Sequence, residues 1–404
     1  MPAAQRPRVL VSTDIGGTDP DDFQSMVHLL LYADVLDIEG LIASPYGKGR
    51  AADIHRVIDC YEQDLSQLRR HADYPEPAAL RAVVKQGSEH LADHHGLTGA
   101  TEGSEWIIQR ARDGDGRLLE VLVWGGLDDV AQALHDAPDI VERIRVHYIG
   151  GPNTMWSINA YDYLEQQHPT LRMIESNSTY RGFFEQHPED QAGPDNEQCV
   201  RAHAGCGALG EFFAAQLPRL KMGDSPTVTW LLHGEQDPAT PSWGGRFVPL
   251  WADRKRRFDR LTTADDRAEV NAAVEISLPK PADYTGTDHA RLLVNDRVQG
   301  PFPLGSDEGD RLRFRLSVYH AGTVTYRVQS SHAQLEGLAG EFTAVVPGPD
   351  AAAVVSDRHP RWWSDDPDPA QAVGPWLGVR WISRYRQEFL GDFAERLGWC
   401  GRER

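Results

Sequence analysis

Short apolar runs alternate with amphipathic stretches from residue 8 to about residue 229. The runs have the length of buried parallel strands, and the stretches between them repeat apolar residues at the spacing of helices. The pattern predicts strands at residues 9–12, 38–43, 120–124, 145–149, 171–174 and 227–232, and helices at residues 51–65, 102–112, 127–135 and 199–216. Because the two kinds of element alternate, we expect an α/β fold with a mostly parallel sheet and helices on both faces.

The pattern changes to a period of two between residues 269 and 346. It predicts strands at residues 270–278, 290–294, 311–319, 323–330 and 340–346, as in a small antiparallel β-sandwich. Residues 381–399 are again helical, with a row of apolar side chains on one face. We therefore expect an α/β domain of residues 1–264 and 357–404, interrupted by a β-rich domain of residues 265–356. The Trp-rich segment 357–375 is interpreted as a surface loop.

The composition argues against nucleic acids and membranes as partners. The 404-residue chain has 41 basic and 60 acidic residues and a formal net charge of −19, so its surface repels nucleic-acid polymers. No apolar run approaches the roughly 20 residues of a membrane span, and the first residues lack the apolar core of a signal peptide. We expect a cytoplasmic protein without a membrane partner, and the formation of a homo-oligomer stays open.

Four carboxylates follow the first predicted strand closely: Asp14, Asp19, Asp21 and Asp22. A Gly-Gly pair lets the backbone turn there, so that the carboxylates can converge at the carboxyl end of the strand. Like charges held together require a cation, and carboxylate oxygens suit Ca²⁺ or Mg²⁺ better than zinc. The alternative interpretation is an acidic helix start, since the amino terminus of a helix favours negative charge. Spacing alone leaves both interpretations open.

Polar or turn-forming residues also follow the later predicted strands. Two glycines after Trp124 expose the backbone carbonyls at that turn, and carbonyls are good Ca²⁺ ligands. Amide side chains after a strand can bind hydroxyl groups as donor and as acceptor. The candidates for substrate binding are Asn153, Asn159, Asn177 and His233, and Asp237 follows the last predicted strand. Ligands bind outside the carboxyl ends of parallel strands, so we expect these residues to contribute to one site.

The order of these motifs resembles the calcium-dependent nucleoside hydrolase superfamily, and more closely its nucleoside-hydrolase-like branch, some members of which are described as cellulose-binding. That family has an Asp-rich turn, a Gly-Gly-Leu strand end, a Gly-Gly strand end, an Asn-containing segment and a late Asp-Pro. Here they are Asp14-Ile-Gly-Gly-Thr-Asp-Pro-Asp-Asp, Gly125-Gly-Leu, Gly150-Gly, Asn159 and Asp237-Pro. The resemblance covers about residues 8–250 and 357–400.

The resemblance implies a Ca²⁺ ion held by Asp14, Asp22, Asp237 and the carbonyl of Trp124. It also implies that Asp14 takes a proton from the attacking water, while Asp21 and Asn159 bind ring hydroxyls of a small sugar or nucleoside substrate. The implied activity is hydrolysis of the glycosidic bond of a furanoside, with Mg²⁺ as an alternative metal. The chemistry is consistent, because a cation acidifies water and a carboxylate can then act as base.

Two departures from the family pattern bear on the site. Three extra residues separate Asp14 from the Asp21-Asp22 pair, which makes Asp19 an alternative ligand. The His that precedes the late Asp in the family is Gln236 here, and His233 lies out of register, so protonation of the leaving group has no assigned residue. A carbohydrate-binding protein without turnover is therefore the alternative function.

Overall fold

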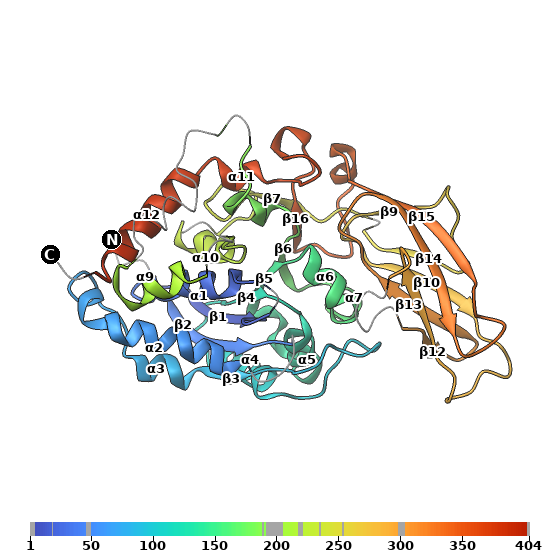
Figure 1. Cartoon of the computed structure of the whole chain (residues 1–404), viewed down its shortest axis with the longest axis horizontal. Helices are drawn as coiled ribbons and strands as arrows, with labels where there is room; N and C mark the ends of the chain where they lie inside the picture. The colour runs from blue at the N-terminus through green and yellow to red at the C-terminus, as the bar shows by residue number, and fades with distance from the viewer. Residues whose placement is uncertain are drawn as a thin grey trace.

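An eight-stranded sheet with the order β3-β2-β1-β4-β5-β6-β16-β7 forms the centre of the computed structural model (Figure 1). The structure describes residues 5–17, 19–45, 50–187, 190, 205–216, 221–233, 236–252, 254–297 and 304–401. The strands, in sheet order, are β3 (Val84–Gln86), β2 (Asp37–Ala43), β1 (Arg8–Thr13), β4 (Leu119–Trp124), β5 (Ile144–Ile149), β6 (Arg172–Ser176), β16 (Trp362–Asp365) and β7 (Phe247–Pro249). Neighbouring strands are parallel except β16 and β7, so the mostly parallel sheet is confirmed.

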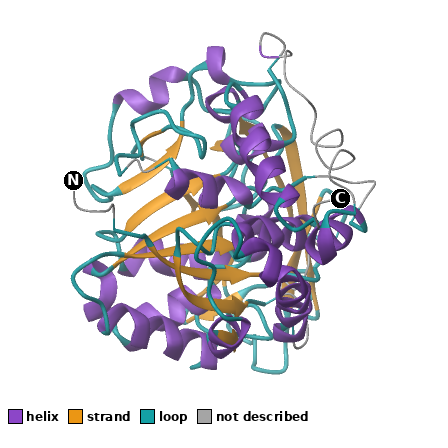
Figure 2. Cartoon of the chain, turned by 90° about the vertical axis from the view of Figure 1, so that its left-hand side faces the viewer, coloured by secondary structure: helices purple, strands orange, loops and turns teal. Residues whose placement is uncertain are grey.

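Helices cover both faces of this sheet (Figure 2). Side chains alternate along a strand, so Val9 and Val11 of β1 pack in one apolar cluster and Leu10 packs in the other. The first cluster includes residues of α1 (Asp21–Leu31), α2 (Ala51–Leu68), α3 (Pro77–Ala82), α9 (Gly207–Ala214), α10 (Ser225–Leu232), α11 (Arg380–Ser383) and α12 (Arg386–Gly398). The second includes residues of α4 (Glu102–Arg112), α5 (Asp128–Asp136) and α7 (Ile158–Gln167), and α6 (Pro152–Trp156) precedes α7. None of the described helices is long and apolar enough to cross a membrane.

Two four-stranded sheets form a β-sandwich beside the α/β part (Figure 1). One contains β12 (Ser306–Glu308), β13 (Arg311–Leu316), β10 (Val274–Pro279) and β8 (Arg256–Phe258), and the other contains β11 (Ala290–Val294), β14 (Gly322–Ser330), β15 (Ala339–Val345) and β9 (Arg267–Glu269). Ile276, Phe314 and Phe342 are fully buried between them. The expected sandwich is present, but its edge strands β8 and β9 run parallel to their neighbours. Strand β8 precedes residue 265, and the exact domain boundaries stay a prediction.

Two segments of the α/β part differ from the sequence prediction. Residues 227–232 were predicted as a strand and lie in helix α10. The supposed surface loop contains Trp362 and Trp363, which lie in strand β16 between β6 and β7. Trp362 is only 1% exposed, because it packs against Tyr161 and His359. The last parallel strand of the sheet thus comes from the chain after the sandwich.

Asp365, the last residue of β16, carries a buried carboxyl group. Burial raises its pKa from 3.8 to about 7, even though the backbone amide of Thr179 donates a hydrogen bond to it. A raised carboxyl pKa means that the folded state holds the proton more tightly than the unfolded chain. The contribution of Asp365 to stability is therefore lost as the pH rises from about 4 to about 7.

Asp365→Asn removes this titration. We expect the free energy of unfolding of the variant to rise, relative to the unsubstituted protein, by about 2–3 kcal/mol between about pH 5 and pH 8. Urea unfolding at the two pH values measures the difference. The control is Asp139→Asn, because Arg112 lowers the pKa of this exposed carboxylate and it does not titrate in that range. A difference for Asp365→Asn that is independent of pH would contradict the assignment.

Candidate functional site

The carboxyl ends of β1, β4 and β5 border a small polar cavity of about 120 Å³. The chain places β2 and β3 on one side of β1 and β4 to β6 on the other, and α/β sheets bind ligands at such a switch in strand order. The walls contain five carboxylates and one ammonium group, those of Asp14, Asp19, Asp21, Asp22, Asp224 and Lys221. The four carboxylates that the sequence places together do converge here, and Trp124 and Asn153 line the same cavity.

Three of the carboxylates are held in an environment that disfavours their negative charge. Burial raises the pKa of Asp14 to about 6. The pKa values of Asp22 and Asp224, which are 4% and 2% exposed, are also raised by burial, and the nearby charge of Asp14 raises both further. Carboxylates that repel one another in a buried place are stabilised by a cation.

The donor set at the cavity fits a hard divalent cation. Asp19, Asp21 and Asp22 each offer a carboxylate oxygen within 4.8 Å of the others, which makes a candidate metal site. Atom Oδ2 of Asp224 is buried and has no hydrogen-bond partner among the residues that the structure describes. Buried acceptors are normally satisfied, so this oxygen is available to a ligand. Carboxylate oxygens are the preferred ligands of Ca²⁺ and Mg²⁺.

Local sequence explains why these groups meet. Thr13 ends β1, and its hydroxyl donates a hydrogen bond to the carboxylate of Asp22 in the first turn of α1. Gly125 follows β4, where a Cβ atom would lie 2.9 Å from Cβ of Asp14, so only glycine allows the two strand ends to approach. The helix-start interpretation describes the same residues. Asp22 thus belongs both to the candidate metal site and to the first turn of α1, although no side chain caps that helix end by a hydrogen bond.

Lys221 is a residue of the cavity that the sequence analysis did not identify. Its Nζ lies 2.9 Å from Oδ2 of Asp19 and 2.8 Å from Oδ2 of Asp21, so the ammonium neutralises these two carboxylates. The side-chain oxygen of Gln24 accepts hydrogen bonds from the amides of Lys221 and Met222 and fixes this segment to α1. No local motif marks Lys221, because its partners lie about 200 residues earlier in the chain.

The structure places Asp224, and not Asp237, at the cavity. Asp224 directly precedes α10, whereas Asp237 follows it, is exposed, and accepts a hydrogen bond from the amide of Ala239 at 3.0 Å. The neighbouring Gln236 accepts two hydrogen bonds from Arg145, which lies at the amino end of β5. Asp237 is thus held near the opposite end of the sheet. An Asp-Ser-Pro sequence is a helix-start signal, and it could have identified Asp224.

The remaining predicted residues divide into two groups. Asn153 lines the cavity, and its amide group donates to the carbonyl of Ile149 at 3.0 Å. Asn177 does not line the cavity. Its Oδ1 accepts a hydrogen bond from the amide of Gly151, which follows the lining residue Gly150. Asn159 donates to the carbonyl of Ala92, and His233 is exposed at the end of α10, so neither lines the cavity. Trp156 and Tyr180 line it instead.

A protein-family model described as cellulose-binding Sde182, nucleoside hydrolase-like domain matches residues 8–247, more than half of the chain. The chain belongs to this family. Its fold is also similar to that of a nucleoside hydrolase-related hypothetical protein from Saccharophagus degradans that is associated with carbohydrate metabolism. That match has 18% identity and a TM-score of 0.51, and it covers 85% of this chain and 100% of the other.

Two further solved structures are more distant from this member of the Sde182 nucleoside hydrolase-like family. The inosine-uridine preferring nucleoside hydrolase from Bacillus anthracis has 17% identity and a TM-score of 0.35, over 55% of this chain and 80% of that one. A purine-preferring ribonucleoside hydrolase from Gardnerella vaginalis has 16% identity and a TM-score of 0.35, over 55% and 78%. The sequence matches none of the functionally curated proteins. The family match and the likeness to the Saccharophagus degradans protein, which at 18% identity shows the fold alone, confirm the predicted nucleoside hydrolase-like fold.

Proposed function

We propose that this protein hydrolyses the glycosidic bond of a furanoside, such as a nucleoside or another pentosyl compound, with the help of Ca²⁺. The observation that carries the proposal is the group of three carboxylates at one cavity, of which Asp22 and Asp224 are buried and Asp14 is partly exposed. A protein that only binds neutral sugar gains nothing from acids whose pKa values are raised by burial and, for Asp22 and Asp224, by the nearby charge of Asp14. Membership of a nucleoside hydrolase-like family supports the same reading.

The residues proposed to hold the cation are Asp14, Asp22, Asp224 and the carbonyl of Trp124, with Asp19 as an alternative ligand. Mg²⁺ is the alternative ion. A bound cation of this kind supplies positive charge that makes a water molecule more acidic. Asp14 acts as the base that accepts the proton as water attacks the anomeric carbon, in a single displacement without a covalent intermediate.

The outer part of the cavity is proposed to bind the sugar. Asp21 accepts hydrogen bonds from ring hydroxyls, and Lys221 holds its carboxylate in place. Asn153 offers an amide to further hydroxyls, and the partly exposed ring of Trp156 offers an apolar wall for the C–H face of a sugar.

No histidine is among the described residues that line the cavity. The groups there that hold a proton at neutral pH are the phenol of Tyr180, whose pKa is raised by burial, and the ammonium of Lys221. Neither is a strong acid, so we expect the fastest turnover with leaving groups that need little protonation, such as nitrophenolate.

A carbohydrate-binding protein without turnover is the second candidate. The description of its family as cellulose-binding favours this candidate, as does the lack of a histidine among the described cavity residues. Incubation with a panel of nucleosides and nitrophenyl furanosides, with and without a chelator, separates the two. Release of base or nitrophenol that stops in chelator supports hydrolysis. Binding of a sugar with no release from any member of the panel would favour the second candidate.

Trp156→Ala tests the proposed sugar wall. We expect the affinity for the furanoside, measured by KM or by calorimetry, to fall roughly tenfold, because the variant loses one aromatic contact face. Trp156→Phe keeps a ring at this position and is expected to retain most of the affinity. An alanine variant with unchanged affinity would place the sugar elsewhere in the cavity.

A further inference from the structure

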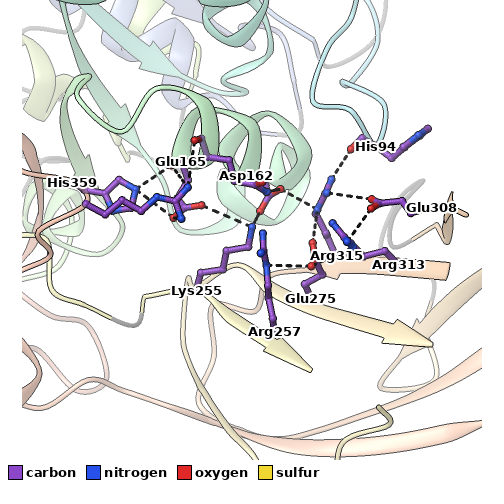
Figure 3. A network of polar contacts seen from close by, with 12 residues as sticks. His94, Asp162, Glu165, Lys255, Arg257, Glu275, Glu308, Arg313, Arg315 and His359 are labelled. Atoms are coloured by element: carbon purple, nitrogen blue, oxygen red, sulfur yellow. Dashed lines mark hydrogen bonds and ion pairs between the residues drawn. The ribbon is translucent and has the colours of Figure 1, made fainter. Parts of the chain in front are cut away.

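A second cavity, of about 400 Å³, lies where the α/β part meets the β-sandwich. It is lined by residues 250–252, 254 and 255, which lead into the sandwich, by residues 354–359, which return from it, by Tyr161 and Glu165 of α7, and by Ala273. Figure 3 shows Glu165, Lys255 and His359 at one end of the polar network that joins α7 to the sandwich. None of its lining residues lines the cavity that contains Asp14, Asp22 and Asp224, the acidic cavity. Its volume is in the range of small-molecule sites.

This second cavity, the seam cavity, has hydrogen-bonded polar groups in its wall. Atom Nδ1 of His359 lies 3.1 Å from the hydroxyl of Ser356, and Nε2 lies 3.0 Å from the carbonyl oxygen of Glu165. Both His359 and Ser356 are 6% exposed. Two cations also line the cavity: Lys255 pairs with Asp162, and the buried Arg254 contacts Glu269 at 3.3 Å and the carbonyl of Val270 at 3.2 Å.

Arg358 differs from these two cations in its exposure to solvent. Its side chain is 52% exposed, and its contacts with the carboxylate of Glu165 and the carbonyls of Glu165 and Gln166 are 3.3–3.5 Å long. Arg361, three residues later, makes two contacts of 2.7 and 2.6 Å with Glu142. A guanidinium group that is both exposed and held only by long contacts can turn its planar fork to a carboxylate or phosphate.

The mouth of the seam cavity is apolar. Val354 and Val355 are 64% and 49% exposed, and they are two of the four large apolar side chains that are exposed in the described chain. The backbone of residues 354–356 is held to that of residues 250–252 by hydrogen bonds of 2.9 and 2.8 Å, so the two side chains are presented on an ordered segment. Exposed apolar groups beside a polar cavity are typical of a ligand site.

We propose that the seam cavity binds a small organic anion, in which a carboxylate or phosphate group lies against Arg358 and a ring-sized body covers Val354 and Val355. A sugar acid and a sugar phosphate share this chemistry. The Asp357 carboxylate at the rim and the Glu165 carboxylate on the floor exclude ligands that present a second negative charge to them. The site is independent of the hydrolysis proposed for the acidic cavity, because the two share no lining residue.

Calorimetric titration of the full chain tests the proposal, with glucuronate, ribose 5-phosphate, glucose and inorganic phosphate as probes. We expect one of the two organic anions to bind, glucose not to bind, and a chelator to leave binding unchanged. Arg358→Ala should weaken binding at least about tenfold, as expected for loss of a charge-assisted contact. Arg361→Ala is the matched control and should keep the affinity within about twofold.

The apolar wall has its own test. Val355→Ser should weaken binding of the organic anion and leave any binding of inorganic phosphate unchanged. The proposal is overturned if neither organic anion binds, if Arg358→Ala binds as tightly as Arg361→Ala, or if inorganic phosphate binds as tightly as the organic anions. Thermal unfolding of each variant confirms that the chain is folded when the titration is made.

Discussion

Asp14→Asn is expected to lower the turnover of any furanoside that the protein hydrolyses by about a thousandfold. The amide is almost the same size as the carboxylate, but it cannot accept a proton from water and is a weaker ligand for a divalent cation. Loss of a general base alone costs about a hundredfold to ten-thousandfold in rate. Initial rates with the substrate found by the panel, at saturating concentration and with Ca²⁺ in excess, measure the effect.

The matched control is Asp129→Asn. As for Asp14, burial raises the pKa of Asp129 to about 6, but the carboxylate of Asp129 binds Ser88 and Thr101 away from the cavity. This variant reports what the loss of a buried carboxylate does to the fold alone, and its turnover should stay within a few-fold of normal. Turnover by Asp14→Asn at the level of the control would contradict the role of Asp14.

The second large effect concerns the choice of metal ligand. The sequence points to Asp237, whereas the structure places Asp224 at the cavity. Asp224→Asn is expected to lower Ca²⁺ affinity by on the order of a hundredfold, since loss of even an outer partner of a metal ligand costs tenfold to a hundredfold. Asp237→Asn should leave the affinity unchanged, because this side chain is exposed and bonded to Ala239. The rise of the melting temperature in excess Ca²⁺ measures both variants, because an ion that binds only the folded state stabilises it.

If Asp237→Asn loses the calcium-dependent rise and Asp224→Asn keeps it, the late Asp-Pro motif is the ligand after all. The described position of residues 236–237 at the amino end of β5 would then not be the one adopted with calcium. Equal rises for both variants and the unsubstituted protein would place the ion away from Asp224.

The fold was predictable where burial leaves a simple pattern. Strands β1, β4 and β5 are buried along their whole length and are mostly apolar, although Glu120 interrupts β4 and Arg145 and His147 interrupt β5. Helices α2 and α4 each bury one face, and their predicted ends agree closely with the structure.

The same reasoning failed for helix α10. Its residues Ser225 to Leu231 are all buried, and they include Thr and Val side chains that favour strands. A short apolar run that is buried on all sides gives no period, so a strand and a helix cannot be told apart by pattern. Only the Asp-Ser-Pro start at residues 224–226 distinguishes them.

Strand β16 was missed for a different reason. It has four residues and lies in a Trp-, Pro- and Asp-rich segment, and it joins the sheet only through partners far away in the chain, Met173 and Val248. Such long-range pairing leaves no local signal in the sequence.

The part of the site that comes from one short segment was predictable from the sequence. The carboxylates after β1 converge because one turn and one helix start carry them, which the sequence states directly. Lys221 and Asp224 come from a segment about 200 residues later, and their place depends on how α10 packs against α1 and on the contact of that segment with Gln24. The wrong prediction for α10 therefore drew attention to Asp237, after this segment, and away from Asp224, before it.

Direct calcium titration of the purified protein tests the central claim, that Asp14, Asp22 and Asp224 form one metal site. Isothermal titration of chelator-treated protein is expected to show one Ca²⁺ per chain, and no binding in the variant that carries Asp14→Asn, Asp22→Asn and Asp224→Asn together. The triple variant removes repelling buried charges, so we expect it to remain folded without the ion. Absence of calcium and magnesium binding by the unsubstituted protein, or equal binding by the triple variant, would contradict the claim.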